Sequence, residues 1–330
     1  MRRVITAGAV AMATTFGTAP VIRRALVRWG SFDLPNHRSS HSIPVPRGGG
    51  LACAAGAALG LASLEGSPGV PRSVAVGLTA LALTGLADDQ LGNVPVPVRL
   101  GVQAASGCLF SGVHVTLPAA SLVTAGVVNV VNFMDGINGI SGGTAAVWGV
   151  STLVVGRSEH DPVLAALGSV TAGVGLGFLP WNVPIAKLFL GDVGSYLIGG
   201  LMAAALAGRL SQPAIAWRTA APLLLYGVDA AQAIMRRHHA GQHVTEAHRE
   251  HIYQHLVDDA HLSHTHVATI HATAAVGIAL ATHFMSARIG APVIALIASG
   301  YLASPMLARR WQRRFDGPAS LDLPHNTTTS

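Results

Sequence analysis

Two adjacent acidic residues, Asp88 and Asp89, end an apolar stretch in the sequence Gly85-Leu-Ala-Asp-Asp-Gln. Carboxylates at membrane depth are costly, and acidic residues found there usually mark a functional site. Two solvated acids at the point where a helix leaves the bilayer would produce the same pattern. The pair by itself is therefore only a weak indication of catalysis.

A second group of polar residues is spaced by three: Asn129, Asn132 and Asp135. Residues three apart share one face of a helix, so we expect these side chains to project into one cavity. Amides and a carboxylate in that arrangement can ligate a hard cation or bind the base and ribose of a nucleotide. The alternative is a polar seam, because asparagine side chains also hydrogen-bond between helices in membranes.

Asp192 lies between glycines in Gly191-Asp-Val-Gly-Ser195, directly before a predicted helix. Glycine lets backbone N–H groups approach an anion closely, and a helix N-terminus favours negative charge. In that setting Asp192 can hold Mg²⁺ against a bound pyrophosphate. A simple N-cap of the following helix is the alternative interpretation.

The segment 33–50 is rich in proline and ends in three glycines. Arg38 and Arg47 in this segment are suited to bidentate contacts with phosphate. A basic anchor at the membrane surface would explain the two arginines. It would not explain Asn36, His41 and the glycines beside them, so the segment is also a candidate binding loop.

More than half of the sixteen histidines lie in the segment 236–266, which includes His248, Arg249 and His251. The residue order typical of zinc proteases is absent, and no cysteine contributes. A histidine-rich tract that binds metal loosely is one interpretation. Partly protonated imidazoles beside Arg249 would equally suit a diphosphate.

Apolar helices must position all of these groups. Half of the 330 residues are apolar, 11% are charged, and the mean hydropathy is +0.48. Runs of about 17 to 22 apolar residues are long enough to cross a hydrocarbon core roughly 30 Å thick. The sequence therefore predicts an all-α, polytopic integral membrane protein with about eleven transmembrane helices. The predicted spans are 4–22, 48–65, 71–87, 99–116, 117–134, 139–156, 162–180, 191–208, 212–234, 266–286 and 289–307.

The first span also resembles a secretory signal, which would leave ten helices. Against that interpretation, Arg23, Arg24 and Arg28 follow the span and favour a cytoplasmic position for that end. We expect a single polytopic domain over residues 1–315 and a disordered tail over 316–330.

Loop charges predict an orientation in the inner (plasma) membrane. With the N-terminus outside and the C-terminus in the cytoplasm, about two thirds of the 21 Lys and Arg residues fall on the cytoplasmic side. The polar segments then lie at the ends of odd-numbered spans, which predicts one active site on the cytoplasmic face. The basic residues form no compact patch, which argues against nucleic acid as a partner. Cys53 and Cys108 both lie in predicted spans, so we expect no disulfide framework.

Taken together, the motifs resemble those of the polyprenyl-phosphate N-acetylhexosamine-1-phosphate transferases, a membrane family that includes the phospho-N-acetylmuramoyl-pentapeptide transferases. The late histidine loop is most similar to the branch that starts envelope glycans such as O-antigen or teichoic acid. The motifs, in the family's order, are Asp33-x-Pro-Asn36-x-Arg38-x-x-His41 with Pro46-Arg47-Gly-Gly-Gly50, Asp88-Asp89, Asn129-x-x-Asn132-x-x-Asp135-Gly, Gly191-Asp192-x-Gly-Ser195, and His248-Arg249-x-His251-x-Tyr-Gln254.

The resemblance implies transfer of a sugar 1-phosphate from a UDP-N-acetylhexosamine to undecaprenyl phosphate, with release of UMP. It implies Mg²⁺, or Mn²⁺ in its place, as the cofactor, the lipid bilayer as the setting, and it is compatible with a homodimer. Its implied catalytic residues are Asp88, Asp89 and Asp192, and its implied metal ligands are Asn132 and Asp192. Its implied substrate contacts are Asn36, Arg38, Arg47, Asn129, Asp135, Lys187, His248, Arg249 and His251.

Asn138 departs from the family pattern, because many members carry aspartate at that position. Any role that requires a charge there is in doubt. Two other functions stay open. A secondary transporter would also gather polar residues among helices, although usually at the midplane and in repeated halves. The histidine-rich segment keeps open a metal-handling membrane protein.

Overall fold

The computed structural model describes residues 1–35, 43–64, 69–92, 94–111, 117–239, 241 and 250–315, with side chains as far as residue 310. Helices account for nearly all of this part of the chain. They are α1 (Arg2–Trp29), α2 (Gly50–Ala62), α3 (Arg72–Leu91), α4 (Val96–Ser111), α5 (Leu117–Met134), α6 (Ile140–Ser158), α7 (Pro162–Asn182), α8 (Gly191–Ala207), α9 (Pro213–Ala220), the 3-10 turn η1 (Ala221–Leu223), α10 (Leu224–His239), α11 (Ile252–Asp258), α12 (His264–Phe284) and α13 (Ala287–Phe315).

Every predicted span contains a helix, and the prediction of an all-α polytopic membrane protein is confirmed. By length and composition, six helices of the described residues can cross a membrane: α1, α3, α5, α7, α12 and the part of α13 up to residue 310. Helices α2 and α8 are apolar but shorter. The full count of eleven crossings and the orientation stay predictions.

The ninth predicted span, 212–234, is not one continuous helix. Helix α9 ends before η1, and α10 starts after it. Pro222 lies in η1, and proline lacks the N–H that a continuous helix would use there. The short helix α11 was not predicted, and α13 runs beyond the predicted end at residue 307.

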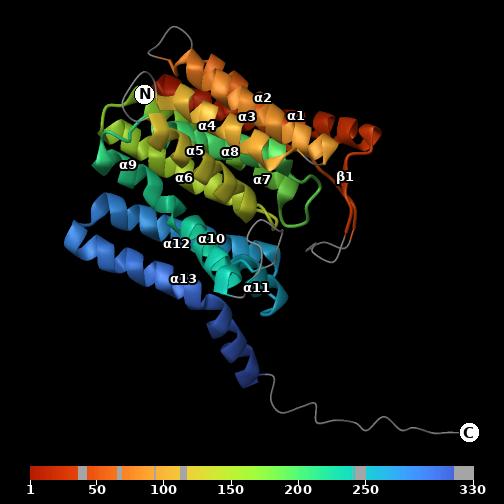
Figure 1. Ribbon diagram of the computed structural model, residues 1–330, viewed down its shortest axis with the longest axis vertical. Coiled ribbons are helices and arrows are strands. Elements are labelled where there is room, and N and C mark those ends of the chain that lie inside the picture. Colours follow the sequence, from red (N-terminus) through yellow and green to blue (C-terminus); the bar gives the residue numbers. More distant parts are fainter. Residues whose placement is uncertain are drawn as a thin grey trace, which may run out of the picture.

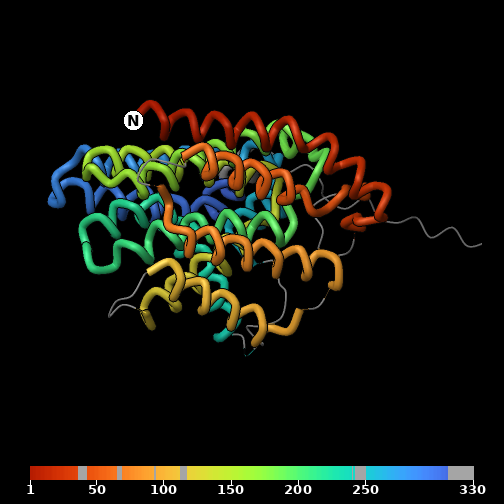
Figure 2. Tube along the Cα trace, turned by 90° about the horizontal axis from the view of Figure 1, so that it is seen from above, coloured from red at the N-terminus to blue at the C-terminus, as the bar shows by residue number. Residues whose placement is uncertain are grey.

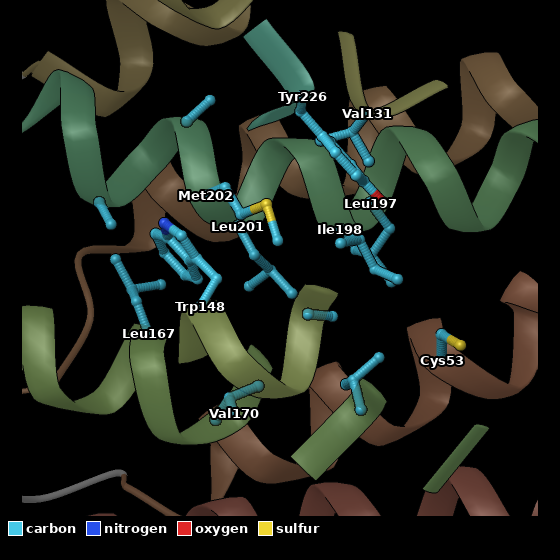
Figure 3. Close-up of a cluster of buried hydrophobic side chains, with 14 of the residues drawn as sticks. Cys53, Val131, Trp148, Leu167, Val170, Leu197, Ile198, Leu201, Met202 and Tyr226 are labelled. Atoms are coloured by element: carbon cyan, nitrogen blue, oxygen red, sulfur yellow. The ribbon is translucent and has the colours of Figure 1, made fainter. Parts of the chain in front are cut away.

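Helix α8 forms the centre of the bundle, because it packs against α2, α3, α4, α5 and α7. Its residues are all buried except Asp192. Figure 3 shows Leu201 and Met202 of this helix beside Trp148 of α6, with Cys53 of α2 in the same core. Burial of Cys53 agrees with the packing role expected for it, whereas Cys108 is exposed. Asp192 therefore stands at the end of a helix that is held on several sides.

The helices run side by side, with α1 along one face of the bundle (Figures 1 and 2). The short antiparallel pair of β1 (Phe32–Asp33) and β2 (Val45–Pro46) follows α1. Figure 1 shows β1 and α11 toward the same end of the molecule, and α9 at the other end. The described parts of two polar segments, β1 after the first helix and α11 in the late segment, thus lie toward one end of the bundle.

Candidate active site

The N-terminus of α8 is held by Asp89 of α3. The Asp89 carboxylate accepts hydrogen bonds from the backbone N–H groups of Asp192, at 2.9 Å, and Val193, at 3.0 Å. These N–H groups have no partner within their own helix, so an acceptor from another helix satisfies them. The Asp89 side chain is 0% exposed. Asp89 is therefore placed to position Asp192 rather than to meet a substrate.

Two glycines allow other parts of the chain to approach the N-terminal turn of α8 closely. Gly191 has a φ of +72°, and a Cβ atom there would meet the Asp89 carboxylate. A Cβ atom on Gly50, at the start of α2, would overlap the backbone of Gly194. The glycine run after Arg47 thus lets α2 approach α8 backbone to backbone.

Arg47 joins the two acids. Its Nε donates to Asp89 Oδ1 at 2.8 Å, and one of its terminal nitrogens lies 3.1 Å from Asp192 Oδ2. The Arg47 side chain is 38% exposed and that of Asp192 is 20% exposed. Arg47 was predicted as a phosphate-binding residue, and its guanidinium lies at the open side of this cluster.

Asn132 of α5 completes the cluster around Asp192. Its amide nitrogen donates to Asp192 Oδ1 at 2.8 Å and to Ser195 Oγ at 2.9 Å. Asn132 and Asp192 were predicted from separate motifs as partners in one metal site. The structure brings their side chains into direct contact.

Asp88 has different partners from its neighbour. Its Oδ1 accepts from the backbone N–H of Val94 at 2.9 Å, and its Oδ2 pairs with Arg99 of α4 at 3.0 Å. Arg99 also lies 3.5 Å from the Tyr196 hydroxyl of α8. Both oxygens of Asp88 are thus engaged, and its side chain is 9% exposed. Through Arg99, Asp88 connects α3 with α4 and α8.

Asp135 lies in the loop between α5 and α6, where Ser141 donates to its Oδ1 at 2.6 Å. Burial raises the pKa of Asp135 to about 7, and the negative charge of Asp192 acts in the same direction. Arg47 opposes part of that shift. Three carboxyl groups, those of Asp89, Asp135 and Asp192, thus lie around the guanidinium of Arg47, so acidic groups outnumber basic ones among the described residues of this cluster.

Asn129, predicted to share a cavity with Asn132 and Asp135, has a partner on a neighbouring helix, and its role in binding substrate stays a prediction. Its amide nitrogen donates to Gln103 of α4 at 2.7 Å. This contact is the polar seam that the spacing also allowed. Each step of three residues falls about 60° short of a full helical turn, and Asp135 lies just beyond the end of α5.

Lys187 lies apart from the Asp192 cluster. Its Nζ is 6.0 Å from the centre of the Trp181 ring, and its side chain is exposed. Asn138 donates to the backbone oxygen of Pro184 at 3.3 Å, a contact that needs no charge. Four predicted site residues lie outside the described part of the chain: Asn36, Arg38, His248 and Arg249.

His251 reaches the same end of the bundle through its neighbours. Its Nδ1 lies 2.8 Å from Asp229 Oδ1 of α10. Two residues further on, the Tyr253 hydroxyl donates to the backbone oxygen of Phe133 at 3.2 Å, next to the loop that carries Asp135. The late histidine segment and the asparagine helix, predicted to act together, are therefore connected directly.

Several residues of these networks were not predicted, among them Arg99, Ser141 and Asp229. Asp229 did carry a signal, because it is an acid inside an apolar span, which is costly unless the group has a role. Arg99 carried a similar one as a basic residue in the fourth span. Ser141 carried none, because serine is common in membrane helices and forms many local hydrogen bonds.

A metal site at this cluster has to be judged on its donors. Among the described residues, no three His, Cys, Asp or Glu side chains are placed to hold a metal ion. Mg²⁺ needs no such group, because it is commonly held by one or two carboxylates, with substrate phosphates and water as its other ligands. Asp192 and the oxygen of the Asn132 amide fit that pattern, whereas a closed zinc site does not.

An apolar cavity of about 710 Å³ opens beside the cluster. It lies between α2 and α3, which hardly touch each other, and Val193 and Leu197 of α8 line it. Leu51 and Leu86 line it as well, close in sequence to Gly50 and Asp88. The site thus adjoins an apolar space between two helices.

Comparison with known proteins gives one family. The family model described as glycosyl transferase family 4 matches residues 72–208. This range includes the paired aspartates, the asparagine helix and Asp192. The matched segment thus carries most of the cluster just described.

Individual relatives also match this chain. The decaprenyl-phosphate N-acetylglucosaminephosphotransferase of Mycobacterium tuberculosis is 33% identical over 79% of this chain and 76% of its own length. The probable undecaprenyl-phosphate N-acetylglucosaminyl 1-phosphate transferase of Bacillus subtilis is 28% identical over 78% of each chain. The phospho-N-acetylmuramoyl-pentapeptide-transferase of Symbiobacterium thermophilum is 34% identical over 36% of this chain and 40% of its own length. The similarity is thus broader to the first two than to the third.

Proposed function

Because the chain belongs to glycosyl transferase family 4 and is a membrane-embedded transferase, we propose that it transfers a sugar 1-phosphate from a UDP-sugar to a polyprenyl phosphate. The donor is a UDP-N-acetylhexosamine, with UDP-N-acetylglucosamine as the first candidate. The acceptor is undecaprenyl phosphate or its decaprenyl counterpart, because relatives are named for each. The product would start a lipid-linked glycan of the cell envelope.

The contact of Asp192 with both Arg47 and Asn132 carries this proposal. A diphosphate donor needs cations around its oxygens and a rigid frame that aligns the attacking and leaving oxygens. Arg47 supplies a fixed cation, and a forked guanidinium can bind two phosphate oxygens. The N-terminus of α8 supplies the frame, because α8 is packed on several sides.

The proposed reaction exchanges one phosphate linkage for another. An oxygen of the lipid phosphate attacks the phosphorus that bears the sugar. The bond from that phosphorus to the bridging oxygen breaks, and its electron pair leaves with UMP. The products are a polyprenyl diphosphate sugar and UMP, so the reaction needs no separate nucleoside triphosphate. The sequence accordingly has no P-loop motif.

Each group of the cluster has a place in the proposed reaction. Asp192 and Asn132 would hold Mg²⁺, which when bound offsets the charge of the diphosphate. Arg47 would bind phosphate oxygens, together with His251 and its neighbours in the late segment. Asp135 would bind the nucleotide.

No protein base has to activate the acceptor. A phosphate monoester has a second pKa near 6, so it is already mostly dianionic at neutral pH. The Asp88 carboxylate is occupied by Arg99 and the Val94 N–H. We therefore assign Asp88 to positioning rather than to proton transfer, and Asp89 to holding the α8 N-terminus.

UMP release tests the proposal. Purified protein in lipid nanodiscs would receive undecaprenyl or decaprenyl phosphate, Mg²⁺ or Mn²⁺, and each of several UDP-N-acetylhexosamines in turn. We expect UMP from one donor, dependent on both lipid and metal. Thermal denaturation with a cooperative transition would show that the purified protein is folded. If such protein releases no UMP with any pairing of donor and acceptor, the proposal is contradicted.

A further inference from the structure

We infer that Asp229, supported by Tyr301, is a positioning residue for the proposed transfer, because it fixes the ring of His251 toward the phosphates of the donor. The inference deepens the proposed function and rests on it for the identity of the substrate. Asp229 lies on α10, and no sequence motif singled it out.

Three groups from two separate parts of the chain converge on the Asp229 carboxylate. His251 Nδ1 lies 2.8 Å from Oδ1, and the backbone N–H of Ile252 donates to the same oxygen at 3.1 Å. The Tyr301 hydroxyl of α13 donates to Oδ2 at 3.1 Å. The Asp229 side chain is 0% exposed and that of His251 is 6% exposed. A buried carboxylate with this many donors is costly to build, and it defines the position of each donor closely.

The contact sets the tautomer of His251. An ionised carboxylate only accepts hydrogen bonds, so the hydrogen of the contact belongs to Nδ1. The second ring nitrogen, Nε2, is then the atom through which the imidazole meets other groups. A carboxylate behind a functional histidine has this effect in many metal and catalytic sites.

A second anchor holds the ring on the side of the active site. The Tyr253 ring stacks on His251, with centroids 5.4 Å apart and an interplanar angle of 13°. The Tyr253 hydroxyl reaches the backbone of Phe133, and a Cβ atom on Gly136 would overlap it. His251 is therefore held between α10 on one side and the loop of Asp135 on the other.

The chain contains a matched control four residues away. His255 Nδ1 lies 2.8 Å from Asp259 Oδ2, the same pair of groups at the same distance as His251 and Asp229. The His255 and Asp259 side chains are 23% and 37% exposed, so this pair is at the surface. Exposed ion pairs contribute little, so Asp259→Asn should leave UMP release within about twofold of the unmodified protein.

Asp229→Asn keeps the size of the side chain but removes the charge that fixes Nδ1–H. We expect kcat/KM for the UDP-sugar to fall about 10- to 100-fold, as for second-layer partners of other functional histidines. Tyr301→Phe removes one donor and should cause a smaller loss in the same direction. If Asp229→Asn does not fold, Tyr301→Phe still tests the inference through its kcat/KM.

A double substitution separates positioning from a general structural role. If Asp229 acts through His251, Asp229→Asn in a His251→Ala background should lower kcat/KM by less than about twofold further. If the fold-loss of kcat/KM in the double variant equals the product of the losses in the two single variants, the inference is contradicted. Unchanged kcat/KM in both Asp229→Asn and Tyr301→Phe would contradict it as well.

A readout independent of catalysis keeps the inference apart from the proposed function. In NMR spectra of protein with ¹⁵N-labelled histidine, the Nδ1–H signal of His251 is identified as the one that is lost in His251→Gln. We expect this signal to disappear in Asp229→Asn as well and to persist in Asp259→Asn. Persistence of that signal in Asp229→Asn would overturn the inference. If the His251 signal behaves as expected but the protein releases no UMP, the contact between Asp229 and His251 is supported and the proposed reaction is rejected.

Discussion

Charged residues lie at both ends of α8. At one end each described acid has its own basic partner, and at the other end several acids share one. Beyond the C-terminus, Arg209 forms an ion pair with Asp161, the N-cap of α7. At the N-terminus, Asp192 and Asp89 share the guanidinium of Arg47, and Asp135 adds a third carboxyl group nearby. The first arrangement is complete, and the second leaves room for a cation.

The difference separates a structural use of charge from a functional one. Matched pairs can tie loops together, whereas unmatched carboxylates at membrane depth lower stability and are retained where a ligand needs them. Acids at helix N-termini can therefore look alike in sequence and have opposite roles. Four substitutions test this comparison.

The largest effect is expected for Asp192→Ala. Loss of the proposed metal ligand should lower kcat for UMP release by at least about 100-fold, as for removal of a group that stabilises charge in the transition state. Asp161→Ala is the matched control, because it also removes an acid from a helix N-terminus. It should retain kcat within about twofold. Equal losses in the two variants would contradict the distinction between the two ends.

Arg47→Lys should have the next largest effect. The guanidinium reaches Asp89 through Nε and Asp192 through a terminal nitrogen, and a lysine ammonium cannot reproduce that forked geometry. We expect kcat/KM for the UDP-sugar to fall about 10-fold or more while charge is retained. Arg209→Lys serves as the control, and wild-type kinetics in Arg47→Lys would show that the fork is unnecessary.

Asp135→Asn should change stability in a pH-dependent way. The folded protein holds a proton on Asp135 up to about pH 7, whereas an unfolded chain releases it near the ordinary value of 3.8. The folded state therefore binds more protons between these values, and its stability falls as pH rises through that window. The variant lacks this loss.

Thermal denaturation without substrate or metal measures the effect. The melting temperature of Asp135→Asn, relative to the unmodified protein, should increase by several degrees from pH 5 to pH 8. A difference between the two proteins that does not vary with pH would show that Asp135 titrates normally.

The smallest effect is expected for Arg209→Ala. The partnership with Arg209 and the Leu164 backbone N–H lowers the pKa of Asp161 despite its partial burial. The stabilisation is therefore present above the ordinary aspartate pKa and is lost as pH falls through the lower folded value. At pH 7 we expect a loss of about 1 kcal/mol in stability with UMP release unchanged. Urea denaturation at pH 7 and pH 3 would check this, and an equal loss at both values would refute it.

Much of the fold followed from the sequence, because hydrocarbon admits few kinds of backbone. A chain with long apolar runs must satisfy its N–H and C=O groups internally, which predicts helices in all eleven ranges. The break at Pro222 and the helix α11 were missed. Helix α11 has only seven residues, too few for a helical period to stand out in the sequence. A proline inside an apolar run does not by itself show where the helix stops.

Residue types and their order also determined the family and the main members of the site. Arg47, Asn132 and Asp192 were predicted from three separate motifs, and they are in contact. Amino-acid type carries this information because few side chains can bind phosphate or Mg²⁺, and those few are rare in apolar helices.

Only the tertiary structure decided how adjacent residues divide their roles. Asp88 faces Arg99, and Asp89 faces Arg47 and the N-terminus of α8. Successive residues of a helix point about 100° apart, so neighbours in sequence meet different helices. Asp229 behind His251 shows the same limit. The two residues are 22 positions apart in sequence, and their contact depends on how α10, α11 and α13 pack. Sequence determines which side chains are available, and packing determines which of them meet.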